Sequence, residues 1–470
     1  MHLHGRAYSM HRHALTSLAI VLLLPICAAA QAPPLQALVS IDFDGSREAI
    51  TPDGILAPVG GEALEYVEGR AGQAADFGEG DWVEYHDIPA IYPKSATIEL
   101  WVKPAFENKD LEDHCYLQLF DADGKQVVEV NFAQTHCGPR ALLTCGGKQT
   151  NCHADFASKG NEWNHICVTW DHTDRDLWNL RIYCNGVVRA YMDFQEVERP
   201  TVLRLGAKSA QEATNTNALI DEVAIYNRAL SEMQVFALYE AAATGRDRIA
   251  AVAARVTADD AEATRRMEQF RSEKKMAMVV GRTIGGWKDE VFGESYGLPV
   301  PDRIDEKQIE NTDLSRYDVL LFPGGGGFDL TEAGAEALRQ YLQDGGGFVG
   351  ICAGCYAAGT YKLIEREFYP FRERGQVEVY LHEHPVTEGY HPLRQIALAH
   401  ANGPLIQPGE ETEDILVYKV GKPPYVCAVA REYGKGRVVA FSAHPEGSAE
   451  TRRMVRNAIF WASGVMGAAE

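Results

Sequence analysis

The ten residues Gly345–Gly354 constrain the possible folds of this chain more than any other feature. They read Gly-Gly-Gly-Phe-Val-Gly-Ile-Cys-Ala-Gly, so an apolar, strand-like run ends at Cys352, and small residues typical of a helix start follow. Gly350 and Gly354 flank the cysteine at positions minus two and plus two. This spacing is typical of a nucleophile elbow, a strand-to-helix turn too tight for bulky neighbours. A cysteine held at a helix N-terminus is favoured as the thiolate.

A histidine and a carboxylate follow a second apolar run near the C-terminus. Val438–Ala443 is typical of a buried strand, and His444-Pro445-Glu446 comes directly after it. Because parallel strands bring their carboxyl ends to one edge of a sheet, His444 and Glu446 can converge on Cys352. A cysteine between glycines is often only a small packed residue. Both features at strand ends together favour a Cys-His-Glu site, with Cys352 as nucleophile, His444 as base and Glu446 as its orienting group.

A glycine loop follows another strand-like run, Asp318–Phe322. In the loop Pro323–Gly327, backbone N–H groups can turn toward a reacting carbonyl, so Gly324 and Gly325 are candidates for an oxyanion hole together with the N–H of Ala353. A flexible turn would have the same composition. A phosphate-binding loop is disfavoured, because the Lys-Ser/Thr ending is absent.

Strand and helix patterns alternate through the second half of the chain. Met278–Val280 is strand-like, and Thr331–Leu342 has the periodicity of an amphipathic helix. This alternation predicts a doubly wound, mostly parallel sheet with ligands at the carboxyl ends of its strands.

The motifs Pro-Gly-Gly-Gly-Gly, Gly-Ile-Cys-Ala-Gly-Cys-Tyr and Ala-His-Pro-Glu resemble those of the class I glutamine amidotransferase-like superfamily. Within it, His384–Gly389 and Ala401–Pro404 resemble the biotin-protein ligase N-terminal domain family. The resemblance covers about Met276 to Gly464 and implies a flavodoxin-like α/β fold. Glutaminases of the superfamily carry glutamine where this chain has Tyr356, close to the substrate. The chain contains no synthetase or biotin ligase domain, so the resemblance implies neither ammonia transfer nor biotinylation.

The first half of the chain has an all-β pattern. Ala96–Val102, His165–Trp170 and Leu180–Tyr183 are strand-like runs separated by turn residues, which predicts a sandwich. The segment Ile220–Leu230, reading Ile-Asp-Glu-Val-Ala-Ile-Tyr-Asn-Arg-Ala-Leu, resembles a laminin-G-like domain, a concanavalin-type jelly roll. Relatives of that family bind glycans or calcium, or only pack against a partner domain. The tryptophans in strand-like runs favour core packing, and glycan and metal binding both stay open.

Six cysteines cluster within this first half. In a secreted β domain such a cluster predicts up to three disulfides. Zinc is the alternative, although no C-x-x-C pair occurs among them. The six candidates are Cys115, Cys137, Cys145, Cys152, Cys167 and Cys184.

Residues 1–30 have the features of a signal peptide. Arg6 and Arg12 precede an apolar run, and Ala28-Ala29-Ala30 fits a cleavage site, so we expect a secreted or periplasmic protein. The apolar run is too short for a membrane span. A net charge of −21 without a basic block argues against nucleic acid as a partner.

The sequence therefore predicts a multidomain protein, with an all-β jelly-roll sandwich at residues 36–242, a helical linker at 243–274 and a doubly wound, amidotransferase-like α/β domain at 275–466. The predicted activity is cysteine-dependent hydrolysis or acyl transfer on a small-molecule or peptide substrate, and no motif implies a cofactor. Two alternatives remain: a binding or scaffold protein with a vestigial site, and a redox protein using the C-x-x-C pair Cys352 and Cys355.

Overall fold

The structure, a computed structural model, describes residues 34–467 with several gaps. The residues left out are 62, 108, 136–137, 146–147, 155, 157–159, 173–177, 195–196, 207–213, 283–295, 393–394, 411–412, 420–423 and 448–450. The predicted signal peptide lies outside the described residues.

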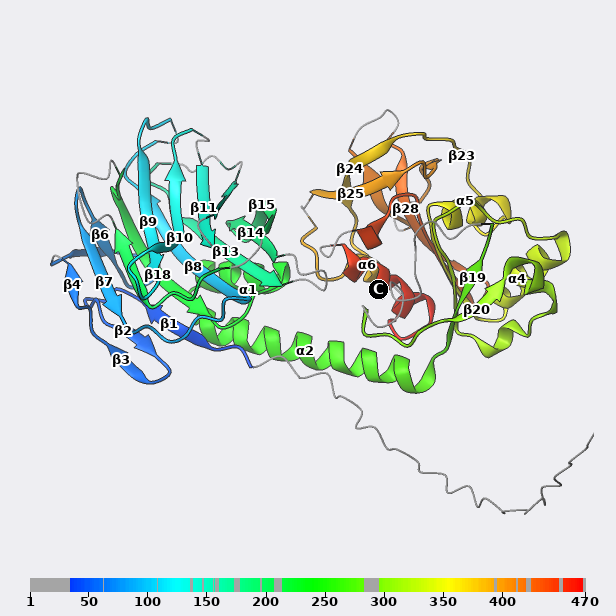
Figure 1. Ribbon diagram of the computed structural model, residues 1–470, viewed down its shortest axis with the longest axis horizontal. Coiled ribbons are helices and arrows are strands. Elements are labelled where there is room, and N and C mark those ends of the chain that lie inside the picture. The colour runs from blue at the N-terminus through cyan, green and yellow to red at the C-terminus, as the bar shows by residue number, and fades with distance from the viewer. Residues whose placement is uncertain are drawn as a thin grey trace, which may run out of the picture. The chain divides into compact units, whose positions relative to one another are not determined.

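Two antiparallel sheets form the N-terminal sandwich (Figure 1). The first runs in the order β15 (Val187–Phe194), β14 (Trp178–Cys184), β13 (Asn164–His172), β8 (Ser95–Pro104), β18 (Ala218–Tyr226), β1 (Ala37–Ile41), β2 (Ala49–Thr51), β3 (Gly54–Leu56), with β6 (Gln73–Phe77) on β18 and β5 (Glu65–Glu68) on β6. The second runs β12 (Lys148–His153), β11 (Gly138–Cys145), β10 (Gln126–Ala133), β9 (Asp113–Phe120), β16 (Val202–Gly206), β7 (Trp82–His86), β4 (Gly60–Gly61); the short β17 (Thr214–Asn215) pairs with β9 in parallel.

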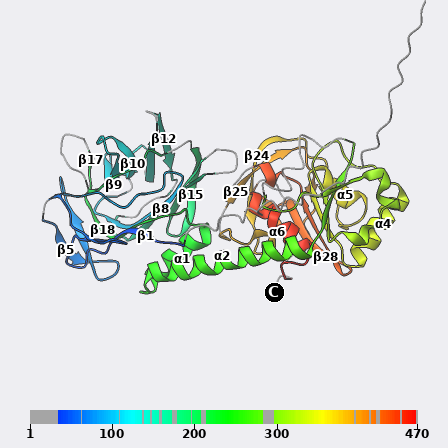
Figure 2. The same cartoon turned by 60° about the horizontal axis from the view of Figure 1, so that its bottom comes forward.

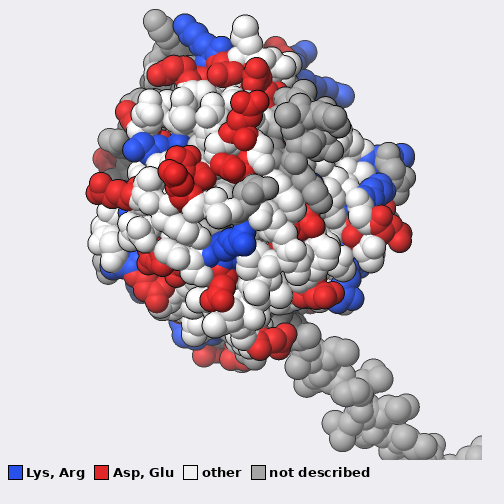
Figure 3. Space-filling view, turned by 90° about the vertical axis from the view of Figure 1, so that its left-hand side faces the viewer, with Lys and Arg blue, Asp and Glu red and all other residues white. Residues whose placement is uncertain are grey.

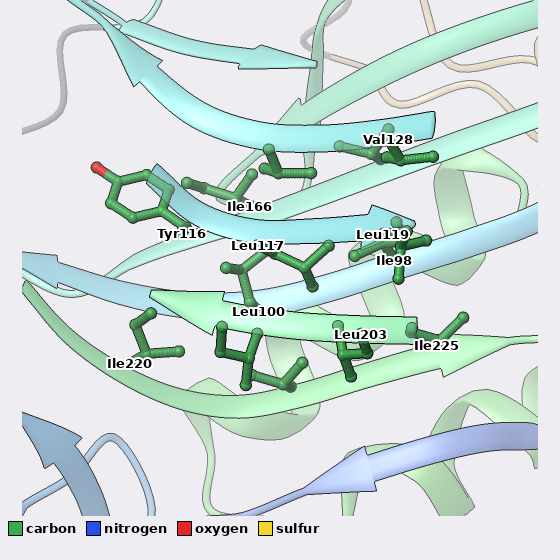
Figure 4. Close-up of a cluster of buried hydrophobic side chains, with 14 of the residues drawn as sticks. Ile98, Leu100, Tyr116, Leu117, Leu119, Val128, Ile166, Leu203, Ile220 and Ile225 are labelled. Atoms are coloured by element: carbon green, nitrogen blue, oxygen red, sulfur yellow. The ribbon is translucent and has the colours of Figure 1, made fainter. Parts of the chain in front are cut away.

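The sandwich has jelly-roll connectivity, because strands far apart in sequence are neighbours. β8 lies between β13 and β18, and β9 lies between β10 and β16. Alternate residues of these strands point into a single apolar core, as period-two side-chain direction requires. Figure 4 shows part of it, where side chains such as Leu100, Leu117 and Ile220 face one another between the strands. The all-β prediction for this half is confirmed.

The expected disulfides are absent among the described cysteines. Cys115, Cys152, Cys167 and Cys184 are free, buried thiols. Cys167 and Cys184 lie on the paired strands β13 and β14 but belong to apolar clusters on opposite faces of that sheet. Cys115 and Cys152 are separated by two intervening strands, roughly 14 Å, which is too far for a disulfide.

These four cysteines therefore act as small apolar residues. Cys137 and the side chain of Cys145 lie outside the described part of the chain.

The linker is one continuous helix after a shorter one. α1 (Glu232–Ala243) is followed by α2 (Arg248–Glu273), whose N-terminal cap is Asp247. α2 continues without interruption through Thr257–Asp260. Within this stretch, the hydroxyl of Thr257 donates to the carbonyl of Ala253, and Asp259 forms an ion pair with Arg255 one turn earlier.

A mixed sheet forms the core of the C-terminal domain. Its order is β20 (Asp302–Asp305), β19 (Met276–Val280), β21 (Val319–Phe322), β22 (Gly347–Ile351), β29 (Gly436–Phe441), β28 (Val426–Tyr433), β27 (Asp414–Tyr418), β24 (Arg374–Leu381), β25 (Gln395–Ala401), with β26 (Leu405–Ile406) on β28 and β23 (Phe368–Tyr369) on β26. The strands from β20 to β29 are parallel, and those from β29 to β25 are antiparallel. The predicted parallel sheet is present, extended by an antiparallel half.

Helices cover both faces of this sheet (Figure 1 and Figure 2). α4 (Glu332–Gln343) and α5 (Ala353–Thr360) pack on one face with Phe348, and α6 (Arg452–Ala462) packs on the other with Val349. Because neighbouring residues of β22 point to opposite faces, the strand is buried on both sides. α4 begins after the cap Thr331, whose side chain accepts from the N–H of Gly334.

Charge is dispersed over the face of the molecule shown in Figure 3. Figure 3 shows acidic side chains spread over one face of the molecule, with basic side chains between them and at the margins. In the described ranges, no helix has the length and apolar character of a membrane span. Within the same ranges, no cluster of three or more His, Cys, Asp or Glu side chains is arranged to hold a metal ion.

The four buried thiols give a first prediction. In native protein, Cys115, Cys152, Cys167 and Cys184 should resist alkylation; after unfolding in urea without reductant, all four should react, because burial alone protects them. Peptide mass spectrometry checks each site. A cysteine that reacts only after reduction would contradict the free-thiol arrangement.

Candidate active site

Cys352 occupies the turn between β22 and α5 in a strained backbone conformation. Its φ is +53° and its ψ is −99°, a region that a non-glycine residue rarely adopts and that costs ~1–3 kcal/mol. Hydrogen bonds hold it from both sides. The Cys352 N–H donates to the carbonyl of Phe441 at 2.8 Å, and the N–H groups of Cys355 and Tyr356 donate to the Cys352 carbonyl. The elbow expected from the sequence is therefore built by strand pairing before the cysteine and helix formation after it.

The two flanking glycines are required by packing. A Cβ atom on Gly354 would lie 1.9 Å from the carbonyl oxygen of Phe322 at the end of β21. One on Gly350 would lie 2.6 Å from the carbonyl oxygen of Gly354. Distances this short are repulsive, so α5 can approach the strands closely enough to form the elbow only when both residues lack a side chain.

His444 and Glu446 follow the neighbouring strand. β29 pairs in parallel with β22, so the ends of the two strands lie side by side. The N–H of His444 donates to the carbonyl of Ala399 at 2.8 Å, which ties this turn to β25. Nδ1 of His444 donates to Oε1 of Glu446 at 2.6 Å, and the Glu446 side chain is fully buried. This bond fixes the imidazole orientation, and the Cys352 sulfur is close enough to the imidazole to interact with it electrostatically.

The electrostatics favour a protonated imidazole. Burial lowers the pKa of His444, but hydrogen bonds and attraction to Cys352 and Glu446 outweigh it and raise the pKa to about 10. Burial also raises the pKa of Glu446, although the bond to His444 partly offsets that effect. An imidazolium beside the sulfur is the arrangement that activates a cysteine nucleophile.

The Cys352 sulfur opens onto a pocket of about 320 Å³. Cys352 itself is 8% exposed, and its sulfur also contacts the carbonyl oxygen of Ala401 at 3.4 Å. Among the described lining residues none is charged, and backbone, aromatic, hydroxyl and amide groups form the walls. The lining consists of Gly325, Gly326, Gly327, Phe328, Cys352, Ala353, Tyr356, Ala357, Thr360, Ala401 and Asn402.

The structure brings most of the predicted site residues together. Gly325 and Ala353 line the pocket beside Cys352, and Ala353 is the first residue of α5, so its N–H has no partner within the helix. Tyr356 forms part of the wall without closing the pocket. Gly324 differs from the expectation, because it is buried beneath the loop and does not line the pocket.

The redox alternative finds little support in the geometry of the second cysteine. Cys352 and Cys355 are both free thiols. Cys355 is fully buried in the apolar cluster between α5 and the sheet, and this burial raises its pKa well above the ordinary value of a thiol. A buried thiol of this kind is a poor partner in thiol exchange.

Sequence reasoning missed the contribution of the turn after β25. Ala401 and Asn402 line the pocket, and His400 lies behind them, bonded through Nδ1 to the carbonyl of Glu373 and through Nε2 to Ser442. The Ala-Asn-Gly-Pro run was visible only as a family resemblance. No spacing rule places it next to Cys352, which precedes it by about fifty residues.

Two family models match the chain. Residues 77–236 match the concanavalin A-like lectin/glucanases superfamily, and residues 266–462 match trehalose utilisation, the ThuA family. Residues 77–236 are thus similar to a concanavalin A-like domain, and residues 266–462, called the ThuA domain below, are similar to the ThuA family. ThuA is a class I glutamine amidotransferase-like family, so the predicted superfamily and the laminin-G-like domain are confirmed. Within this superfamily, the family model that matches is that of ThuA. The expected resemblance to the biotin-protein ligase N-terminal domain family stays a prediction.

Several solved structures resemble part of the chain, and no curated protein matches it. The binding domain of botulinum neurotoxin serotype G is 16% identical, with a TM-score of 0.35 over 44% of this chain and 51% of that chain, about half its length. Domain 4 of AbnA, an extracellular arabinanase from Geobacillus stearothermophilus, is 17% identical, with a TM-score of 0.34 over 43% of this chain and 98% of that domain. Similarity at these identities and TM-scores indicates nothing about the function of the chain.

Replacing Gly354 tests the packing of the elbow. Gly354→Ala should lower the free energy of unfolding by about 1–3 kcal/mol, because its Cβ collides with backbone rather than with a movable side chain. Gly467→Ala is the matched control, since a Cβ there meets no atom within 4 Å. Urea unfolding of both variants gives the comparison. Equal midpoints would show that the strand and helix can separate without cost.

Titration of His444 tests the hydrogen-bonded pair. NMR of the imidazole should give a pKa near 10 in the unmodified protein, and Glu446→Gln should lower it by roughly 1–3 units by removing the negative partner. Because folding raises this pKa, its contribution to stability is complete below pH 6.5 and is lost as the pH rises through about 10. His384, whose pKa is lowered to about 4 by burial, should be unaffected by the substitution. A wild-type midpoint near 6.5 would contradict the arrangement.

Proposed function

We propose that the ThuA domain is a cysteine-dependent hydrolase or acyl-transfer enzyme that works through a thioester on Cys352. The observation that carries the proposal is the strained elbow, which presents a sulfur to a pocket while His444 and the buried Glu446 stand behind it. A backbone strained at a pocket-lining residue has to be compensated by surrounding structure, and such strain clusters at active sites.

Each group has a definite role in the proposed reaction. The sulfur of Cys352 attacks the carbonyl carbon of an amide or ester, and the N–H groups of Ala353 and Gly325 stabilise the oxyanion. The C–N or C–O bond then breaks, and the leaving group takes a proton from the imidazolium of His444. Water, deprotonated by His444, attacks the thioester, releasing the acid and restoring the thiol. Glu446 keeps Nδ1 of His444 occupied, so that Nε2 handles the proton.

The lining of the pocket favours a neutral substrate. A free amino acid such as glutamine carries an ammonium and a carboxylate, and no charged side chain among the described lining residues can pair with either. Tyr356, in the position where glutaminases carry glutamine, contributes a bulky ring to the wall. We therefore expect an uncharged amide, peptide or ester rather than glutamine.

The sandwich has a separate proposed role. Its match to a lectin and glucanase superfamily supports binding of a glycan, which would hold the ThuA domain near a carbohydrate-bearing substrate. Residues 1–30 support secretion or export to the periplasm, where such material is found. Under the alternative, a scaffold with a vestigial site, the sandwich would still bind a glycan, but the pocket of the ThuA domain would catalyse no reaction.

Covalent trapping separates these possibilities. With neutral p-nitrophenyl esters as probes, mass spectrometry should detect an acyl group on Cys352, and His444→Ala should lower turnover by about 10²–10⁴-fold. Cys352→Ala should abolish the adduct. Cys355→Ala is the matched control: it removes the other thiol of the pair but not the nucleophile, so turnover should persist.

Glutamine, tested in parallel, should release no ammonia. Turnover that survives in Cys352→Ala would overturn the proposed mechanism and favour the scaffold alternative. Loss of turnover in Cys355→Ala, with the fold intact, would instead favour the redox alternative.

A further inference from the structure

Asn402 occupies a tightly determined turn next to the nucleophile. It follows β25 directly and has a φ of +62°, in the left-handed region that asparagine tolerates better than most residues. Its N–H donates to the carbonyl of Glu373 at 3.0 Å. The next residue, Gly403, has no room for a side chain, since a Cβ would lie 1.9 Å from the carbonyl oxygen of Ser442. Strand pairing and close packing therefore both determine the position of Asn402.

This turn meets the sulfur of Cys352. The carbonyl of Ala401, the residue before Asn402, lies 3.4 Å from that sulfur. Asn402 lines the same pocket as Cys352, Ala353 and Gly325, which together form the proposed reaction centre. A polar group on Asn402 is thus placed to reach a substrate whose carbonyl is attacked by Cys352.

Arg374 determines which way the carboxamide of Asn402 faces. Arg374 begins β24, where it is paired in register with Ala401 on β25. With the carboxamide assigned from its hydrogen bonds, Oδ1 of Asn402 accepts from Nε of Arg374 at 3.3 Å and from Nη2 at 3.2 Å. A guanidinium has only donors, so it selects the oxygen. The Nδ2 group, with its two N–H donors, then lies on the opposite side of the carboxamide.

We propose that Asn402 is a substrate-binding residue, donating a hydrogen bond from Nδ2 to a neutral acceptor oxygen next to the carbonyl that Cys352 attacks. Arg374 is the positioning residue that keeps the amide in the donating orientation. The inference rests on the proposed function and narrows its substrate class to uncharged compounds with a carbonyl, hydroxyl or ether oxygen close to the reacting bond. An ammonium group, which cannot accept a hydrogen bond, is disfavoured at this place.

Two alkylating agents of different hydrogen-bonding capacity test the proposal without knowledge of the natural substrate. Iodoacetamide carries a carbonyl oxygen beside its reacting carbon, whereas allyl bromide has no acceptor. The rate of Cys352 modification by each is measured by mass spectrometry in the full chain. Asn402→Ala should slow the modification of Cys352 by iodoacetamide about two- to tenfold, because one neutral hydrogen bond is lost. The rate of modification by allyl bromide should not change.

Two further substitutions separate donation from packing. Asn402→Asp keeps an oxygen for Arg374 but loses the donor, so it should slow iodoacetamide selectively, and it serves where the alanine variant does not fold. Arg374→Met should also lower the iodoacetamide-to-allyl bromide rate ratio, and Arg374→Lys should restore part of it by supplying one donor. Arg316→Met, an exposed arginine that does not line the pocket, is the matched control and should leave the ratio unchanged.

The outcomes distinguish this inference from the function it rests on. If wild-type Cys352 reacts with neither reagent faster than the same cysteine in the unfolded chain, the proposed function fails, and this inference fails with it. If Cys352 reacts with both and Asn402→Ala changes the two rates equally or not at all, Asn402 has only a structural role. In that case the proposed hydrolase stands without the assigned donor.

Discussion

The close approach of α5 to the end of β21 is the constraint on which the rest of the site depends. Gly354 brings the helix against the carbonyl of Phe322, a distance that any side chain would prevent. This contact places the helix start directly above the strand ends and forces Cys352 into its strained turn. The turn keeps this conformation because β22 is paired in parallel with both β21 and β29 and is buried on both faces.

A buried charge pair shapes the chemistry that this turn can perform. Glu446 is fully enclosed, and such a carboxylate is costly unless a partner stabilises its charge. His444 supplies that partner, and its interaction with Glu446 helps to raise the pKa of the imidazole. The same interaction therefore orients the imidazole, keeps it protonated and directs it toward the sulfur. The described lining of the pocket in front of Cys352 is uncharged, in contrast to this pair behind it. In the proposed mechanism, the pocket would bind the substrate and the pair would transfer the proton.

The two cysteine groups of the chain show how far residue patterns can be trusted. The elbow around Cys352 was recognisable because steric limits act between residues two positions apart, so they leave a mark in the local sequence. The clustered cysteines of the sandwich suggested disulfides, but pairing depends on which face of which strand each thiol occupies. Cys167 and Cys184 are close in the sheet and still point to opposite faces.

The sequence by itself indicated the class of each domain, the parallel part of the C-terminal sheet, and the candidate site residues Cys352, His444 and Glu446. These follow from local periodicity and from the rule that parallel strands end at one edge. Tertiary structure decided what faces Cys352. Asn402 reaches the pocket only because the antiparallel strands β24 and β25 extend the sheet and return the chain to Cys352, and Arg374 orients it through cross-strand pairing. Contacts of this kind join residues far apart in sequence, and packing rather than local spacing selects them.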